Sequence, residues 1–205
     1  MMPLMTAGLI AAGVSACSRS TAGSAVRIGD AGCQHVSAPL TPITPRDDVE
    51  PLLWVPLPDG WKIQDHRLRD IRLSMWSDKP THDGHRAHAW LIMDSGITVA
   101  ETPEAELESQ GRAIMIDGGG ASNMRPTALQ VCGHPAMLFR YHQAAWANAR
   151  EHDAEVLAVA AESAGTVYVA RLALSADNCD DPQYRRDADT ILRGFEMVLR
   201  GAVNG

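Results

Sequence analysis

The chain has 205 residues, of which 45% are hydrophobic and 21% are charged, which is the balance of a globular protein with one sizeable core. Its formal net charge of −7 disfavours nucleic acid as a partner. The same charge disfavours a polybasic patch that would hold the protein on anionic lipid.

The start of the chain contains an apolar run that ends in Val-Ser-Ala-Cys at residues 14–17. The run is too short to span a bilayer. It resembles the lipobox of a bacterial lipoprotein, in which the cysteine becomes the first residue of the mature protein and carries the acyl chains. We therefore expect residues 1–16 to be a signal peptide and Cys17 to be lipidated. The lipid anchor would hold the protein at the outer face of the plasma membrane or in the cell wall.

Residues 17–50 are rich in Ser, Thr, Ala, Gly and Pro and show no sustained apolar period. This composition predicts a flexible tether that begins at the lipidated cysteine, followed by a single domain over residues 51–200.

Three further cysteines are candidates for one disulfide, which an exported protein can form. Cys132 enters a predicted antiparallel meander and Cys179 leaves it, so these two are expected at opposite ends of a sheet and too far apart to pair. The tether is free to reach either end. The pair that we favour is Cys33 with Cys179.

The first half of the domain predicts strands and one helix. Alternating apolar residues predict strands at 71–76 and 87–93. Thr102 and Pro103 are typical of a helix start, because a hydroxyl caps the first turn and proline fits its first position. The glycine run at 118–120 ends this helix, which we expect over residues 103–116.

The second half predicts three strands with short connections, at about 137–142, 156–161 and 167–174, which is an antiparallel meander. Asp181 then caps an amphipathic helix over residues 182–199, expected to cover one face of the sheet. This order predicts an α+β fold, an antiparallel sheet with helices packed on its faces.

Three features carry a resemblance to a known family: Pro-Asp-Gly-Trp at 58–61, Cys-Gly-His-Pro-Ala at 132–136, and the closing amphipathic helix. Over residues 52–199 the chain resembles the LpqN/LpqT-type lipoproteins of mycobacteria and related actinobacteria. The resemblance implies a fold similar to the Mog1/PsbP-like α/β/α sandwich and a place in the cell envelope. It also implies a role in binding or assembly without catalysis.

The motifs that carry chemistry are few. His82, His85 and His88 are spaced to converge on a helix, whereas Pro80 and Gly84 indicate a turn, so we expect no metal site and no cofactor. The sequence has no Gly-x-Ser-x-Gly turn for a nucleophile, and its glycine run is not followed by a helix that would cradle a phosphate.

The candidate ligand-binding residues are Arg140, His142 and Trp146, a basic and aromatic stripe expected on the face of its strand away from the closing helix. Such a stripe would bind a sugar or an acyl chain.

We therefore predict an envelope lipoprotein that binds a lipid or glycolipid, or docks on an envelope protein complex, and is not an enzyme. The competing predictions are a hydrolase acting on envelope lipid or carbohydrate and a purely structural lipoprotein. A deep apolar pocket with few polar groups would favour the binder.

Overall fold

The computed structural model describes residues 32–64, 71–79, 87–95, 102–117, 121–145, 151–176 and 179–200. Its strands and helices follow one another in this order: β1 (Leu40–Ile43), β2 (Leu52–Pro56), β3 (Trp61–Ile63), β4 (Ile71–Ser77), β5 (His88–Ser95), α1 (Pro103–Asp117), β6 (Ala121–Val131), β7 (His134–Gln143), β8 (His152–Ser163), β9 (Thr166–Ala176), α2 (Pro182–Arg193) and β10 (Glu196–Val198).

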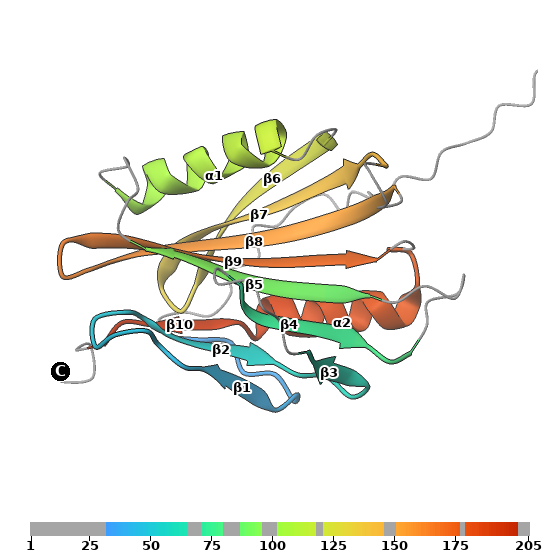
Figure 1. Ribbon diagram of the computed structural model, residues 1–205, viewed down its shortest axis with the longest axis horizontal. Coiled ribbons are helices and arrows are strands. Elements are labelled where there is room, and N and C mark those ends of the chain that lie inside the picture. The colour runs from blue at the N-terminus through green and yellow to red at the C-terminus, as the bar shows by residue number, and fades with distance from the viewer. Residues whose placement is uncertain are drawn as a thin grey trace, which may run out of the picture.

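The strands form two antiparallel sheets. The large sheet has the order β3-β4-β5-β9-β8-β7-β6, and the small sheet has the order β1-β2-β10. Helix α1 lies on one face of the large sheet, and α2 lies with the small sheet on the other face (Figure 1). The predicted α+β fold, an antiparallel sheet with helices on its faces, is confirmed. No helix in the described ranges is long and apolar enough to cross a membrane.

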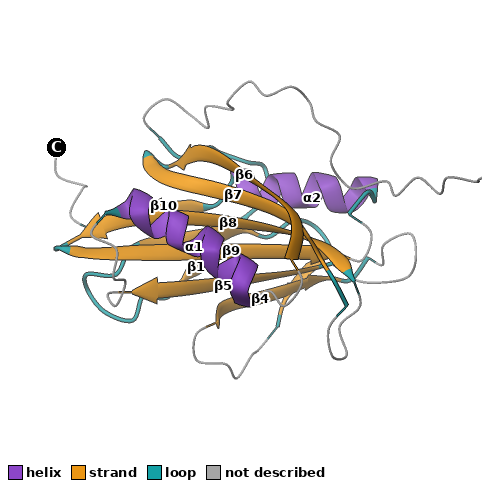
Figure 2. Ribbon diagram, turned by 90° about the horizontal axis from the view of Figure 1, so that it is seen from above, coloured by secondary structure: helices purple, strands orange, loops and turns teal. Residues whose placement is uncertain are grey.

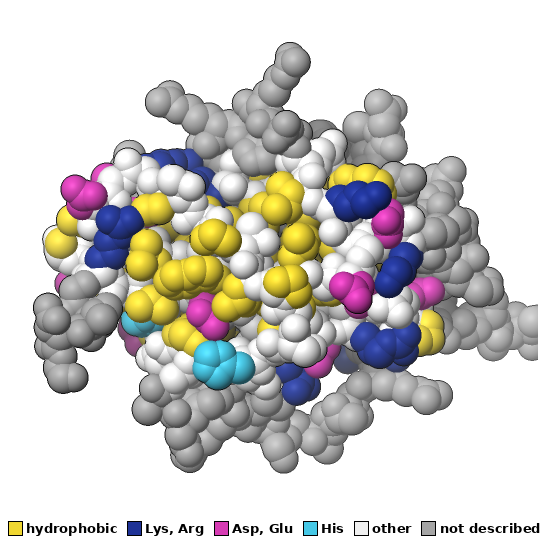
Figure 3. All heavy atoms as spheres, turned by 90° about the horizontal axis from the view of Figure 1, so that it is seen from below, with side chains coloured by type: hydrophobic (Ala, Val, Ile, Leu, Met, Phe, Trp, Pro, Cys, Tyr) yellow, Lys and Arg dark blue, Asp and Glu magenta, His cyan; other side chains and the backbone are white. Residues whose placement is uncertain are grey.

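The face opposite α1 therefore consists of the small sheet and α2. Figure 3 shows this face, where apolar side chains gather near the middle and charged ones lie mostly toward the margins. The main core lies between this layer and the large sheet, and it includes fully buried Phe195, Met197 and Ile191. A smaller core lies beneath α1 and is built around Leu107 and Phe139.

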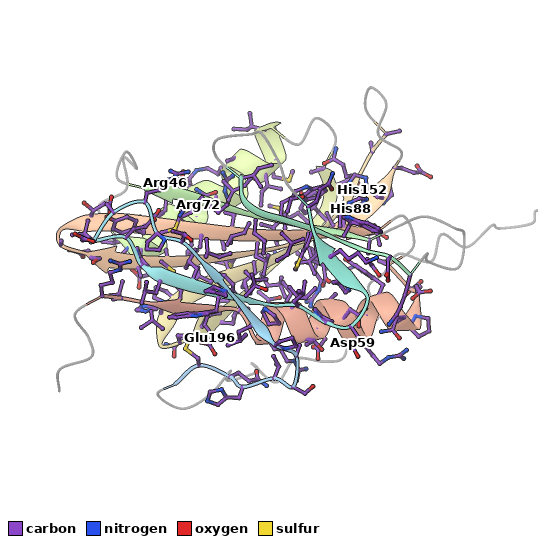
Figure 4. All side chains as sticks on the ribbon, turned by 60° about the horizontal axis from the view of Figure 1, so that its bottom comes forward. Arg46, Asp59, Arg72, His88, His152 and Glu196 are labelled. Atoms are coloured by element: carbon purple, nitrogen blue, oxygen red, sulfur yellow. A yellow bond between two sulfur atoms is a disulfide. The ribbon has the colours of Figure 1, made fainter. Side chains whose placement is uncertain are left out.

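Residues 40–50, which we expected to belong to the tether, are instead part of the folded domain. Strand β1 pairs with β2, and the side chain of Glu50 beyond it is only 1% exposed. Arg72 of β4 donates from Nη1 to Glu50 Oε1 at 2.5 Å and from Nη2 to the carbonyl oxygen of Thr44 at 2.6 Å. Arg46 and Arg72 lie together at this end of the molecule (Figure 4). A buried ion pair and a strand pairing thus hold this segment. The predicted signal peptide and residues 17–31 of the predicted tether lie outside the described residues.

The predicted disulfide between Cys33 and Cys179 is wrong, because the structure joins Cys33 to Cys132 with an S–S distance of 2.02 Å. The prediction treated Cys132 as the start of the first strand of a meander. An additional strand, β6, precedes it, and Cys132 and Gly133 form the two-residue turn from β6 to β7. Both have positive φ, 51° and 80°, as a type I′ hairpin turn requires.

The closing helix is shorter than predicted and ends at Arg193. A Cβ at Gly194 would lie 2.4 Å from the side chain of Val36 and 2.7 Å from that of Pro56, so only glycine fits at this position without a shift. The chain then leaves the helix and pairs as β10 with β2. The apolar residues at 195–199 are therefore strand and core residues, although their spacing also suits a helix. Its predicted start is correct, since Asp181 accepts hydrogen bonds from the backbone N–H groups of Gln183 and Tyr184.

Candidate functional site

An open groove of about 450 Å³ lies beside α1, on the face of the large sheet that this helix covers. Helix α1 forms one wall, and β6 and β7 form the other wall and the floor. The lining is apolar apart from Glu108 and Arg112 of the helix. Its other members are Leu107, Gly111, Met115, Ile116, Met124, Pro126, Met137 and Phe139.

The groove exists because α1 is held close to the sheet at its middle and is left free at its end. Leu107 and Phe139 are 3% and 2% exposed and pack in the small core. A Cβ at Gly111 would lie 2.9 Å from Cε1 of Phe139, so this glycine lets the helix rest directly on the ring. One turn further on, Met115 and Ile116 are 47% and 77% exposed. Helix α1 crosses the strands obliquely (Figure 2). The last turn of the helix therefore leaves these two apolar side chains uncovered.

Strand β6 is the last strand of the large sheet and forms the open side of the groove. Pro126 pairs with Phe139 of the floor, and Met124 belongs to the same apolar cluster. The strand has an irregular register between Ser122 and Arg125, and Asn123 has a φ of +56°. Proline and a bulge on an edge strand both oppose the addition of another strand. The free edge is therefore poorly suited to pairing with a peptide.

The predicted ligand-binding residues Arg140 and His142 do not lie on this face, so their expected position is wrong. Leu138 packs in the core beneath α2, and residues two and four positions along the same strand point to the same side of the sheet. Arg140 Nε lies 2.6 Å from Glu155 Oε1, and His142 Nδ1 lies 2.9 Å from Asp153 Oδ1. Both partners are the cross-strand neighbours on β8. Trp146 lies outside the described residues.

A second arginine, Arg125 of β6, lies directly across from Arg140 in the pairing of β6 with β7. Both residues are exposed and lie on the α2 face of the sheet. Sequence reasoning missed Arg125 because it did not predict β6. The available signal was the alternation of Met124, Pro126 and Ala128 with Arg125 and Thr127, which the proline and the irregular register obscure.

Helix α2 contributes Tyr184 to this part of the molecule. Its side chain is 4% exposed, and its hydroxyl has no hydrogen-bond partner in the part of the chain that the structure describes. Burial raises the pKa of Tyr184 far above its usual value, and the carboxylates of Glu155 and Asp153 raise it further. The tyrosine therefore stays neutral and lies within electrostatic range of the ion pairs that hold Arg140 and His142.

The other residues that the sequence analysis singled out lie elsewhere. His82, His85 and Cys17 lie outside the described residues, whereas His88 stacks on Trp90 with ring centroids 5.9 Å apart. Trp61 is a core residue that donates from Nε1 to Asp187 Oδ2 at 3.0 Å. Within the described ranges, no three His, Cys, Asp or Glu side chains are grouped as metal ligands would be.

Comparison with known proteins gives a likeness in structure. No protein-family model matches the chain, and no curated protein sequence matches it. The crystal structure of LpqN from Mycobacterium tuberculosis, described as involved in cell envelope biogenesis, superposes with a TM-score of 0.61. The match covers 78% of this chain and 91% of LpqN at 18% sequence identity. The fold that the sequence resemblance implied is thus confirmed at the level of LpqN, while the broader likeness to Mog1 and PsbP stays a prediction. The chain has a distant LpqN-like fold.

Proposed function

We propose that the protein is a non-catalytic lipoprotein of the cell envelope that holds the acyl chain of an envelope lipid in the groove beside α1. The lipobox-like sequence supports an anchor at Cys17 on the outer face of the plasma membrane, and the LpqN-like fold supports a place in the envelope. The apolar lining of the groove carries the proposal. Mass spectrometry of the exported protein tests the anchor, which an unmodified Cys17 thiol would contradict.

The lining favours a hydrocarbon chain over a polar ligand. A sugar or a peptide backbone would bring donors and acceptors onto the floor, where Phe139, Met137 and Met124 offer them no polar partner. Met115 in the helix wall adds a third methionine, and methionine side chains adapt to a ligand of variable shape. The volume lies within the range of about 300–1,000 Å³ that small-molecule sites occupy.

The dependence of affinity on acyl-chain length distinguishes a ligand held by its chain from one held by its head group. Each buried methylene contributes about 0.8 kcal/mol, which corresponds to about a fourfold gain in affinity. Affinity for a series of monoacylglycerols should therefore rise steeply with chain length and level off when the groove is filled. A ligand held by its head group alone would show no such rise.

The test is isothermal titration of the full chain with 1-monodecanoylglycerol. Met115→Glu places a carboxylate at the groove wall, and we expect it to weaken binding at least about 10-fold because the charge must lie against the chain. Val49→Glu is the matched control, since Val49 is 46% exposed, against 47% for Met115, and is not among the residues that line the groove.

Three results would contradict the proposal. Equal binding by the two variants would remove the groove as the site, and absence of binding by the wild-type protein would remove the function. Steady release of decanoate from the probe would show that the protein is a hydrolase, the competing prediction from the sequence.

A further inference from the structure

The juxtaposition of Arg125 and Arg140 is not explained by the stability of the fold. The two residues are direct partners across β6 and β7, on the same face of the sheet, and like charges in this position destabilise a strand pair. Arg140 is compensated by Glu155, 2.6 Å away on β8. Arg125 has no ion-pair partner within the described residues. One positive charge is thus left over at the sheet edge of a chain whose formal net charge is −7.

The other charged groups on this face do not neutralise Arg125. Asp153 is engaged by His142 at 2.9 Å, and Glu155 by Arg140. Helix α2 also lies on this side, and the hydroxyl of its Tyr184, within electrostatic range of Arg140, Glu155 and Asp153, is neutral. The guanidinium of Arg140 uses Nε toward Glu155, and its remaining N–H groups can still donate to a ligand.

Arg125 also occupies a particular place relative to the groove. Its neighbours Met124 and Pro126 line the groove on the α1 face, while Arg125 itself lies on the α2 face. Strand β6 is the last strand of the sheet, so the two faces meet at its free edge. Sheets that pack face to face are about 10 Å apart, so the side chains on one face of a single sheet extend about 5 Å from its plane. A ligand that reaches from the groove to Arg125 around the free edge of β6 therefore spans about twice this distance, about 10 Å.

We infer that the groove and the arginine pair form one site that straddles β6. The acyl chain lies on the α1 face, and an anionic head group, a phosphate or a carboxylate, binds Arg125 and Arg140 on the α2 face. Guanidinium groups hold such oxyanions by paired, charge-assisted hydrogen bonds, and a bound anion removes the repulsion between the two arginines. The inference rests on the proposed function, and it names the class of lipid as a single-chain anionic amphiphile.

The test compares three probes by titration of the full chain: 1-decanoyl-lysophosphatidic acid, 1-monodecanoylglycerol with the same chain and no charge, and glycerol 3-phosphate with no chain. We expect the wild-type protein to bind the phosphate lipid about 10-fold more tightly than monodecanoylglycerol, as one good charge-assisted pair provides.

Three variants test which residues produce this preference. Arg125→Gln should lower it and the double variant R125Q/R140Q should abolish it, with monodecanoylglycerol binding unchanged. Arg125→Gln leaves the ion pair of Arg140 with Glu155 intact, so it tests the site without disturbing β8. Arg193→Gln, which removes one positive charge from the last turn of α2, should leave the preference as it is.

The outcomes separate the inference from the proposed function. If the wild-type protein binds both lipids equally, or the double variant keeps the preference, the head-group site is wrong and the groove stands. If glycerol 3-phosphate binds as tightly as the phosphate lipid, the arginines act without the groove and the straddling site is wrong. If neither lipid binds, the proposed function fails and the inference fails with it.

Discussion

Gly111 offers a test in which two well-measured effects oppose each other. Glycine inside a helix is about 1 kcal/mol less favourable than alanine, so Gly111→Ala would stabilise α1 if the helix stood alone. In the folded protein the added Cβ would lie 2.9 Å from Cε1 and 3.4 Å from Cζ of Phe139. The ring is 2% exposed and has little room to move away.

In the wild-type protein, the cost of packing the added methyl group decides whether Gly111→Ala lowers or raises the free energy of unfolding. Forcing an extra methyl group into a filled core costs about 1–3 kcal/mol, so Gly111→Ala should destabilise the protein by about 1 kcal/mol after the gain in helix propensity is subtracted. Phe139→Leu removes the ring atoms that the methyl group would meet. In that background Gly111→Ala should instead stabilise the protein by about 1 kcal/mol, which gives a coupling of about 2 kcal/mol between the two positions.

Urea unfolding of the wild-type protein, both single variants and the double variant measures this coupling. The exposed neighbour Arg112 calibrates the helix, since the difference in stability between Arg112→Ala and Arg112→Gly reports propensity without the contact, about 1 kcal/mol. Stabilisation by Gly111→Ala in both backgrounds would show that α1 does not rest on the ring of Phe139. The account of why the groove exists would then be wrong.

Two further predictions concern the hairpin from β6 to β7. The disulfide between Cys33 and Cys132 closes a loop of 99 residues, so C33S/C132S should lower the free energy of unfolding by about 2–5 kcal/mol; an unchanged urea midpoint would contradict a structural role for the bond. Burial lowers the pKa of His134 below its usual 6.5, so the unfolded chain takes up a proton more readily than the folded protein does. The stability that the neutral imidazole contributes is complete above about pH 7 and is lost as the pH falls through 6.5 toward the lower folded value. Acidification from pH 7 to 5 should therefore lower the free energy of unfolding of the wild-type protein more than that of His134→Gln, and parallel pH profiles would contradict the partial burial of His134.

Local sequence signals predicted both helices and the strands that are largely buried. Thr102 and Asp181 mark the starts of both helices, and Thr102 Oγ1 does accept a hydrogen bond from the N–H of Ala105 at 3.2 Å. Strands β8 and β9 are buried over most of their length and follow the predicted order.

The predictions were wrong where contacts between residues far apart in the sequence determine the structure. The contacts of Gly194 with Val36 and Pro56 end α2 early, and the pairing of β1 with β2 draws residues 40–43 into the fold, neither of which a local pattern can indicate.

Strand β6 was missed for a different reason, which bears on the site. Its burial pattern is mostly exposed along its whole length, because neither of its faces is committed to the core except near Val131. On one face Met124 and Pro126 border the open groove, and on the other Arg125 and Thr127 lie at the surface. A strand is recognised from the alternation of apolar and polar residues along the sequence. That alternation weakens when the apolar positions border an open groove and are not buried in the core. Local rules are expected to fail most often at functional sites. The failure at β6 is thus consistent with the assignment of its two faces to a ligand, and the lipid titrations with Met115→Glu and Arg125→Gln decide whether that assignment is correct.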